Sequence, residues 1–322
     1  CGFRRPSFMA DHLTPPRAAY VHVPFCRRRC GYCNFAVIAG REDLVDGLLR
    51  AIEIELSWLE YPRPIDTLFF GGGTPTQLSP PQLEQLFHLT GTWFILTDGS
   101  EVSVEANPAD LTPGKIDVLQ RSGVTRISLG VQSFDDAKLE CLERDHRRGD
   151  ALQAIAACRQ RFSSVAVDLI FAAPGERIET WRRDLATAID SGPDHISTYA
   201  MTIEKGSAFW GRRARGQLPL VEEADEGAMF EAAIDTLTAA GYEHYEVSNF
   251  ARPGHRCRQN EAYWKGRSYF AAGPGAARYV DGCRETNHRS TTTYLRRVLA
   301  GQSPVAEREV LGAESRARER LG

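Results

Sequence analysis

Three cysteines, Cys26, Cys30 and Cys33, fall within eight positions at the spacing C-x3-C-x2-C. Three thiolates on one short loop can each ligate a different iron of a 4Fe–4S cubane, which normally takes four cysteines. The remaining iron then has no protein ligand and can bind a small molecule, as the open site of a catalytic zinc does. The spacing therefore predicts a 4Fe–4S cluster with one open iron.

A zinc knuckle and chance clustering are the alternatives to this prediction. A tetrahedral zinc site needs a fourth Cys or His at ordinary spacing, and none lies between Cys33 and His88. The eight cysteines of this 322-residue chain are too sparse for a disulfide framework. The pattern indicates metal binding in a reducing compartment.

The elements around the cysteines follow a repeated pattern. A β-type run over 18–23 ends at Pro24, the cysteine loop comes next, and apolar residues spaced by three or four predict a helix over 42–59. The same strand, loop and helix recur, with strands predicted at 18–23, 66–70, 101–105, 126–132, 165–171 and 195–200. Such units imply a parallel sheet wound right-handedly. We therefore expect an α/β fold, a partial (β/α)6 barrel with its chemistry at the strand C-termini.

Further helices are expected at 80–89, 113–121, 135–144, 150–161 and 179–190. Beyond residue 205 the repeat of strand, loop and helix ends. The elements expected there are an Arg- and Gly-rich loop over 206–219, a helix over 222–240, a strand over 243–249, a glycine loop over 272–277 and a helix over 290–299. We interpret this part as a smaller α+β extension. The expected division is a lead-in over 1–17, the core over 18–205, the extension over 206–310 and the start of a further, truncated domain over 311–322.

Composition narrows the class of protein. The chain is 42% hydrophobic and carries a formal net charge of −3, which gives no reason to expect a nucleic-acid partner, although Arg27, Arg28 and Arg29 form a local positive patch. No apolar run is long enough to span a membrane, and no signal pattern opens the chain, so we expect a cytoplasmic location. Association with a membrane surface stays open. The chain begins at Cys1 and ends within a helical pattern, which indicates a piece of a longer protein.

Further polar and glycine residues follow the other strands. The run Gly71-Gly72-Gly73-Thr74 allows backbone to approach a ligand closely, although such a run is also an ordinary turn. Polar side chains stand at or just after the ends of the third, fourth and fifth strands, and any one of them alone would be interpreted as a loop-capping or solvated residue. These residues are Glu105, Gln132, Arg144 and Asp168.

With the cysteine loop after the first strand and the glycine loop after the second, the chain resembles the radical S-adenosylmethionine superfamily. In that superfamily the open iron chelates the amino and carboxylate groups of S-adenosylmethionine. One electron from the reduced cluster then cleaves the sulfonium C–S bond and yields a 5′-deoxyadenosyl radical, which is cofactor chemistry that the protein positions. The resemblance implies that Cys26, Cys30 and Cys33 are the cluster ligands.

The resemblance also implies which residues hold S-adenosylmethionine, by similarity to the coproporphyrinogen-dehydrogenase branch. Glu105 and Arg144 suit the charged methionine end, and Asp168 and Gln132 suit the polar groups. Tyrosines match positions that flank the cluster and the adenine, and Ala200 matches a backbone contact. The implied set is Tyr20, Tyr32, Gly72, Gly73, Thr74, Glu105, Gln132, Arg144, Asp168 and Ala200.

Within the superfamily, the chain looks like the HemW-like heme chaperones. Dehydrogenases of the neighbouring branch carry a fourth cysteine two residues after the third, whereas Phe35 occupies that position here. The resemblance implies heme as cargo, heme-acceptor proteins as partners, an electron donor such as a flavodoxin and a link to porphyrin biosynthesis. Whether the chain is an enzyme stays open. The alternatives are an oxygen-independent coproporphyrinogen III dehydrogenase and a radical enzyme with another substrate.

Two positions depart from the heme-chaperone pattern. The family typically shows His-Asn-x-x-Tyr-Trp, but Gln259 stands at the histidine position of this chain, and Ala277 stands where another histidine is common. A carboxamide is a poor iron ligand, so the heme ligand is not assigned. The other candidates are His22, His255, His288 and Cys257, although a lone histidine is more often a hydrogen-bonded structural residue and a lone cysteine a small buried one.

Overall fold

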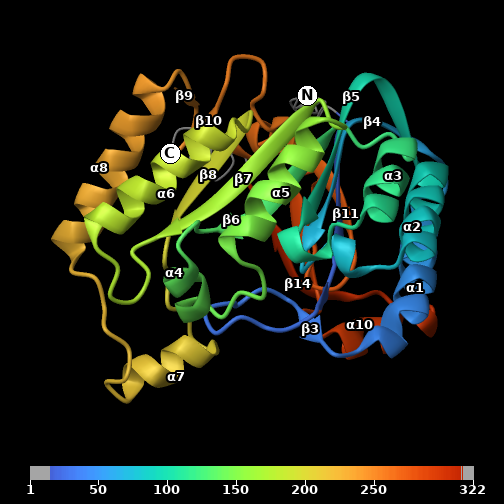
Figure 1. The fold of residues 1–322 in the computed structure, drawn as a ribbon. Coiled ribbons are helices and arrows are strands. Elements are labelled where there is room, and N and C mark those ends of the chain that lie inside the picture. The colour runs from blue at the N-terminus through green and yellow to red at the C-terminus, as the bar shows by residue number, and fades with distance from the viewer. Residues whose placement is uncertain (1–14, 313, 315–322) are drawn as a thin grey trace, which may run out of the picture.

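The computed structural model describes residues 15–312 and 314, and a single large sheet forms its centre (Figure 1). Within these residues the sheet has twelve strands, in the order β14-β13-β12-β11-β1-β4-β5-β6-β7-β8-β10-β9. A second, small sheet pairs β2 (Phe25–Cys26) with β3 (Ile38–Ala39). The strands at the two ends of the large sheet do not pair with each other in the described part of the chain. The sheet is therefore an open barrel, as the sequence predicts.

Six neighbouring strands at the centre of this sheet are parallel. They are β1 (Ala18–Val23), β4 (Arg63–Gly72), β5 (Phe94–Ala106), β6 (Arg126–Gln132), β7 (Ser164–Phe171) and β8 (His195–Ala200). All six predicted strands are confirmed, and β4 and β5 begin earlier than their patterns indicate. Because parallel strands end at one edge, the loops that carry the cysteines and the strand-end polar residues meet there.

Helices cover the outer face of the parallel strands (Figure 1). They are α1 (Val45–Ser57), α2 (Pro80–Trp93), α3 (Pro113–Arg121), α5 (Arg148–Arg159), α6 (Ile178–Ser191) and α8 (Glu223–Ala239). The core lies between them and the sheet, where Val21 and Trp181 are fully buried. Trp181 of α6 also donates a hydrogen bond through Nε1 to the Met229 carbonyl of α8 at 2.8 Å. Alternate strand residues face this core, so the remaining ones point into the barrel.

Shorter helical turns connect the strands to these helices: η1 (Glu42–Leu44), η2 (Pro75–Gln77), η3 (Pro108–Asp110) and α4 (Asp136–Cys141). The first and the last of them correct predicted bounds. The helix expected over 42–59 begins with η1, and the helix expected over 135–144 ends at Cys141.

Two predictions beyond residue 205 are wrong. The expected loop over 206–219 contains a helix, α7 (Ala208–Ala214), whose first turn is capped because Ser207 Oγ accepts a hydrogen bond from Trp210 N at 3.1 Å. The glycines and prolines that flank this short helix concealed it. The single strand expected over 243–249 is interrupted by a bend, giving β9 (Glu243–His244) and β10 (Asn249–Ala251). β10 pairs antiparallel with β8, and β9 pairs with β10 at that edge of the sheet.

The C-terminal part adds strands to the other side of the same sheet. It comprises α9 (Arg258–Trp264), β11 (Tyr269–Ala272), β12 (Ala277–Val280), β13 (Cys283–Asn287), α10 (Thr291–Leu299) and β14 (Val305–Val310). The sequence predicts only the last helix among these elements. β11 lies parallel to β1, whereas the following strands are antiparallel.

The domain boundary at 206 stays a prediction. Most of the lead-in expected over 1–17, and all of the segment expected over 311–322 except 311, 312 and 314, lie outside the described residues. Among the helices that are described, none combines the length and the apolar character needed to cross a membrane.

Candidate functional site

The cysteine loop runs from the end of β2 to β3, directly beyond β1. Cys26 is the last residue of β2, and a turn closed by the hydrogen bond from Cys33 N to the Cys30 carbonyl, at 3.0 Å, brings the other two cysteines together. All three are free cysteines and line one cavity of about 640 Å³ at the strand C-termini. The predicted ligands therefore share one site.

The three thiols fit the ligand set of a 4Fe–4S cluster with one open iron. Among residues 15–312 and 314, no group of three or more His, Cys, Asp or Glu side chains is placed to hold one metal ion. The thiolates of a cubane each bind a different iron, so they do not need to converge on one point. Burial raises the pKa of Cys26 to about 11 and also raises the pKa of Cys33, so loading metal must displace protons from these thiols.

The glycine loop fixes the end of β4 against the chain that leads into Cys26. Gly73 N donates to the Val23 carbonyl at 2.9 Å, and Thr74 N donates to the Phe25 carbonyl at 2.8 Å. A Cβ at Gly73 would lie 2.7 Å from the Phe25 carbonyl oxygen, so only glycine fits there. Thr74 Oγ1 then comes within 3.6 Å of Cys26 Sγ. Gly72, Gly73 and Thr74, all predicted from the sequence, line one wall of the cavity of about 640 Å³, the main cavity of the protein's site.

The predicted strand-end residues line the opposite walls of the same cavity: Glu105 from β5, Gln132 from β6, Asp168 from β7 and Ala200 from β8, together with Tyr32 and Arg144. Gln132 has a left-handed backbone, with φ of 66°, and the pairing of β6 with β7 shifts register just before it. This irregularity is a local strain of the kind that functional sites carry. The structure therefore brings together every predicted cofactor residue except Tyr20.

Arg144 joins the cluster loop to two strand ends. Its Nη2 donates to the Gly130 carbonyl at 2.9 Å and to Asn107 Oδ1 at 3.3 Å, while Nη1 lies 3.6 Å from Cys30 Sγ. Burial by itself lowers the pKa of Arg144, but the Tyr32 phenol and the Cys30 thiol beside it outweigh that effect and raise its pKa. The guanidinium is thus a fixed positive charge next to the thiols.

Glu105 and Asp168 place two carboxyl groups deep in the barrel. Burial raises the pKa of Glu105 to about 7, the nearby Asp168 adds to the shift, and the hydrogen bond from Gly72 N, at 2.9 Å, opposes it. Burial also raises the pKa of Asp168, which accepts a hydrogen bond from Ser128 Oγ at 3.2 Å. A cationic ligand in the main cavity would favour the ionised form of both carboxyls. The wall is suited to a positively charged group such as an ammonium.

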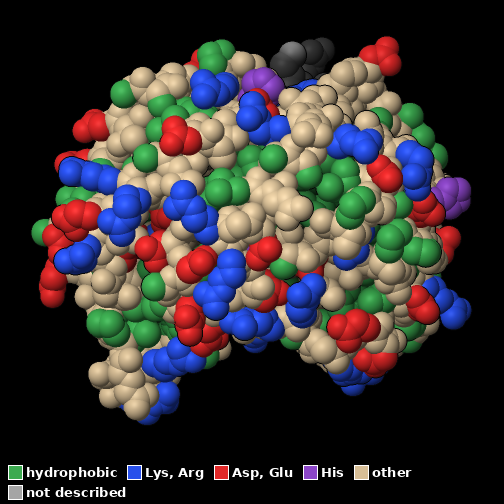
Figure 2. Space-filling view, in the orientation of Figure 1, with side chains coloured by type: hydrophobic (Ala, Val, Ile, Leu, Met, Phe, Trp, Pro, Cys, Tyr) green, Lys and Arg blue, Asp and Glu red, His purple; other side chains and the backbone are tan. Residues whose placement is uncertain are grey.

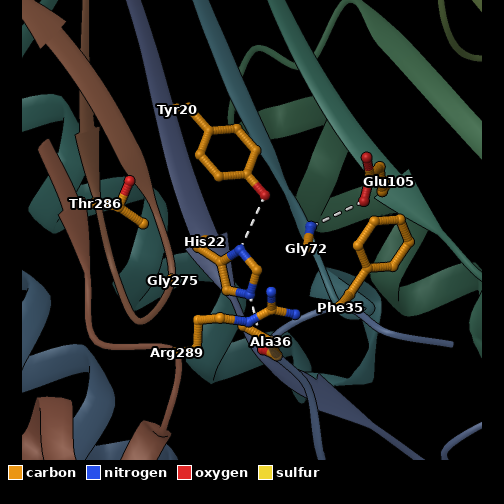
Figure 3. A pocket seen from close by; sticks show the side chains of 9 residues that line it. All are labelled: Tyr20, His22, Phe35, Ala36, Gly72, Glu105, Gly275, Thr286 and Arg289. Carbon is orange, nitrogen blue, oxygen red and sulfur yellow. Dashed lines mark hydrogen bonds between the residues drawn. The ribbon is translucent and has the colours of Figure 1, made fainter. Parts of the chain in front are cut away.

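Tyr20 does not line the main cavity, and its expected place beside the cluster and the adenine stays a prediction. It lines a smaller side cavity of about 320 Å³ next to the main one, with its hydroxyl 3.0 Å from His22 Nδ1 (Figure 3). His22 Nε2 lies 2.9 Å from the Ala36 carbonyl, which can only accept, so Nε2 carries the proton and Nδ1 accepts from Tyr20. The side cavity shares four wall residues with the main cavity: Phe35, Gly72, Glu105 and Arg289.

The candidate heme ligands differ in whether they reach a cavity. Gln259 is 1% exposed, and both ends of its amide are engaged, because Oε1 accepts from Thr67 Oγ1 at 2.5 Å and Nε2 donates to Tyr263 Oη at 2.8 Å. Gln259 is therefore a structural residue inside the barrel. Of the three histidine candidates, only His22 lines either cavity, and His255, His288 and the buried Cys257 line neither.

Several wall residues were not predicted from the sequence. Ser128 belongs to β6 and faces the barrel, so its even spacing from Gly130 and Gln132 could have indicated it. Tyr199 stands beside Ala200 at the end of β8 and has a pKa raised by burial. Arg289 comes from the segment between β13 and α10, and no local signal marks it. Figure 2 shows Lys and Arg side chains gathered around α4 and α7, with Asp and Glu side chains among them.

Comparison with known proteins places this geometry in a class. Residues 20–188 match the Radical SAM superfamily. The solved structure of coproporphyrinogen III oxidase (HemN) from Escherichia coli, described as a radical SAM enzyme, superposes with a TM-score of 0.85 at 24% sequence identity. The match covers 95% of this chain and 74% of that one, and it shows a shared fold.

Sequence relatives give a narrower answer. The protein named heme chaperone HemW of Mycobacterium tuberculosis (strain H37Rv) is 38% identical over 310 residues, which cover 93% of this chain and 79% of that relative. HemW of Bacillus subtilis (strain 168) is 35% identical over 286 residues, covering 87% of this chain and 75% of that relative. The chain belongs to the HemW family of the radical SAM superfamily.

Proposed function

We propose that Cys26, Cys30 and Cys33 hold a 4Fe–4S cluster and that the main cavity holds S-adenosylmethionine beside it. The observation that carries this proposal is that the three thiols and nine of the ten predicted cofactor residues line one cavity of about 640 Å³. That volume lies within the range of ligand sites, about 300–1,000 Å³. When bound and reduced, the cluster supplies the electron for cleaving the sulfonium.

The residues of the cavity have distinct roles in this proposal. Arg144 provides a fixed positive charge for the methionine carboxylate, and the glycine loop brings backbone against the methionine end. Glu105 and Asp168 offer carboxylates to the ammonium and the ribose hydroxyls. Gln132, Tyr32 and Ala200 line the rest of the wall. The chain itself positions the ligand and excludes water.

We further propose that the protein is a heme chaperone, which binds heme and passes it to an acceptor protein. Support comes from relatives that carry the name heme chaperone and align with most of this chain. Heme acceptors, an electron donor such as a flavodoxin, a cytoplasmic location and a link to porphyrin metabolism belong to the same proposal. The heme ligand is not at position 259, because the Gln259 amide is fully engaged within the barrel.

The test uses protein reconstituted anaerobically with iron and sulfide. We expect Cys26→Ala, Cys30→Ala and Cys33→Ala each to lose iron and cluster absorption, and the matched control Cys141→Ala to retain both, because Cys141 does not line the cavity. Unchanged iron in the three site variants would overturn the cluster proposal. Calorimetric titration of the reconstituted protein with S-adenosylmethionine then measures its affinity for this second ligand.

Chaperone activity requires two further measurements. Addition of hemin to the reconstituted protein should develop a Soret band, and mixing the loaded protein with an apo-acceptor should transfer that band to the acceptor. Absence of a Soret band would refute the chaperone proposal. Anaerobic turnover of coproporphyrinogen III to a decarboxylated product would instead identify the dehydrogenase alternative.

A further inference from the structure

The side cavity has no role in the function proposed above. It opens beside the main cavity and is lined by Tyr20 and His22 of β1, by Phe35 and Ala36 of the cysteine loop, and by Arg289 near α10 (Figure 3). Its volume, about 320 Å³, stands at the lower end for a ligand site. It can take a small group, or the edge of a larger molecule, but not a whole macrocycle.

Arg289 gives this cavity a positive charge without a partner acid. Its Nη2 donates to the Asn34 carbonyl, which fixes the guanidinium beside the cysteine loop. Within the described residues no Asp or Glu forms an ion pair with it, although Glu105 lines the same cavity. Burial lowers the pKa of the His22 imidazole to about 4, and the nearby Arg289 charge adds to this shift. An anionic group in this cavity could accept hydrogen bonds from the remaining N–H donors of the Arg289 guanidinium.

Phe35 supplies a flat apolar surface at the same opening. Its side chain is 68% exposed, and it lines both cavities. Figure 3 shows Arg289 reaching into the cavity from one side and Phe35 standing on the other. An exposed aromatic ring beside an unpaired guanidinium fits a ligand that is planar and carries a carboxylate.

We propose that the side cavity receives the propionate-bearing edge of a tetrapyrrole, with Arg289 pairing with a propionate and Phe35 covering the face of the ring. This inference rests on the proposed heme function and adds the site that recognises the cargo. Glu105 also lines this cavity, but its carboxyl accepts a hydrogen bond from Gly72 N at 2.9 Å and forms no ion pair with Arg289 in the described part of the chain. No iron ligand is involved, so metal-free protoporphyrin IX should bind in the same way as heme.

The experiment compares protoporphyrin IX with its dimethyl ester, using quenching of intrinsic fluorescence or porphyrin emission on the reconstituted protein. We expect Arg289→Gln to weaken protoporphyrin IX binding about tenfold, and Arg289→Lys to weaken it less, because a single charge remains. The ester should bind wild type about as weakly as protoporphyrin IX binds Arg289→Gln, and Arg289→Gln should leave ester affinity unchanged. Phe35→Ala should weaken both ligands.

Arg296→Gln is the matched control, because Arg296 is exposed on α10 and lines neither cavity. Equal affinities of wild type and Arg289→Gln for protoporphyrin IX, or an equal loss for the ester, would overturn the inference. If heme still binds and transfers in that case, the chaperone function stands without this site. If porphyrin binding depends on Arg289 but no acceptor receives heme, the site stands and the chaperone function fails.

Discussion

Arg144 is the side chain that couples the cluster loop to the strand ends. Its guanidinium contacts the Gly130 carbonyl and the Asn107 side chain with one nitrogen and approaches Cys30 with another. A lysine in its place has one compact charge and cannot contact the Gly130 carbonyl, the Asn107 side chain and Cys30 at the same time. The geometry of the fork, rather than the charge by itself, should decide how well an anionic ligand group is held.

We therefore expect Arg144→Lys to weaken S-adenosylmethionine binding about tenfold, and Arg144→Gln to weaken it further, with the iron content unchanged. Calorimetric titration of the reconstituted proteins measures the affinity, and chemical iron analysis checks the cluster. Arg182→Gln serves as the control, because Arg182 lies on the exposed face of α6. A wild-type affinity in Arg144→Lys would show that charge suffices.

Glu105 predicts a pH dependence of stability. Burial raises its pKa in the folded protein to about 7, above the value of about 4.3 expected in the unfolded chain. A group with a raised folded pKa stabilises fully below the unfolded pKa, and this contribution is lost as the pH rises through the folded pKa. Between about pH 5 and 6.5, the free energy of unfolding should therefore fall with rising pH.

The measurement compares wild type with Glu105→Gln, which keeps an oxygen for Gly72 N. Urea unfolding of the metal-free proteins across this window should show the wild type losing about 1.4 kcal/mol per pH unit relative to the variant. Parallel curves for the two proteins would mean that Glu105 is not perturbed by burial.

The short helix α7 acts as a support for the cysteine loop. Phe209 is fully buried, its backbone N donates to the Gly31 carbonyl at 2.8 Å, and its ring packs edge-on to Tyr32 at 6.3 Å between centroids. A Cβ at Gly31 would lie 2.4 Å from the Phe209 ring. The helix also carries Arg212, which pairs with Glu143 next to Arg144. The loop between the second and third cysteines is therefore held from outside the βα units.

Overpacking provides a test of this support. Gly31→Ala should lower the thermal midpoint and speed the loss of iron to a chelator, with a cost of about 1–3 kcal/mol. In a Phe209→Ala background, the added methyl should cost much less, since the ring that it meets is gone. Additive effects of the two substitutions would contradict the contact.

The sequence predicts the parts of this protein that depend on local order. The βα units follow from periodic apolar residues, and the cysteines, the glycine loop and Glu105 follow from their places at strand ends. Arg289, Phe209 and the strands after residue 265 could not be predicted in this way. Arg289 contacts the cysteine loop across 255 positions, and β11 pairs with β1 from the opposite end of the chain. Such contacts depend on tertiary packing, which leaves no periodic mark on the chain.

Glu55 shows how the two ends of the chain are joined. It is 4% exposed on α1, and its carboxylate accepts hydrogen bonds from Tyr294 Oη at 2.6 Å, from Asn287 Nδ2 at 2.7 Å and from Gly273 N at 2.9 Å. All three donors belong to the C-terminal segment, more than two hundred positions away. Asn287 Nδ2 also donates to the Gly273 carbonyl at 2.9 Å, so loss of the Glu55 acceptor leaves chiefly the buried Tyr294 hydroxyl and Gly273 N–H unsatisfied. One carboxylate thus ties the first βα unit to the strands that extend the sheet.

We expect Glu55→Ala to lower the free energy of unfolding by about 3 kcal/mol or more, since each orphaned buried donor costs about 1–3 kcal/mol. Glu55→Gln should cost less, because its amide oxygen can replace Oε2 and still accept from both Tyr294 Oη and Gly273 N, so that only the hydrogen bond from Asn287 Nδ2 is lost. Urea unfolding followed by fluorescence measures both, and Glu53→Ala, exposed on the same helix, should stay within about 0.5 kcal/mol of wild type. A midpoint in Glu55→Ala equal to that of Glu53→Ala would show that the C-terminal strands are held to the barrel by β11 pairing and apolar packing, without this carboxylate.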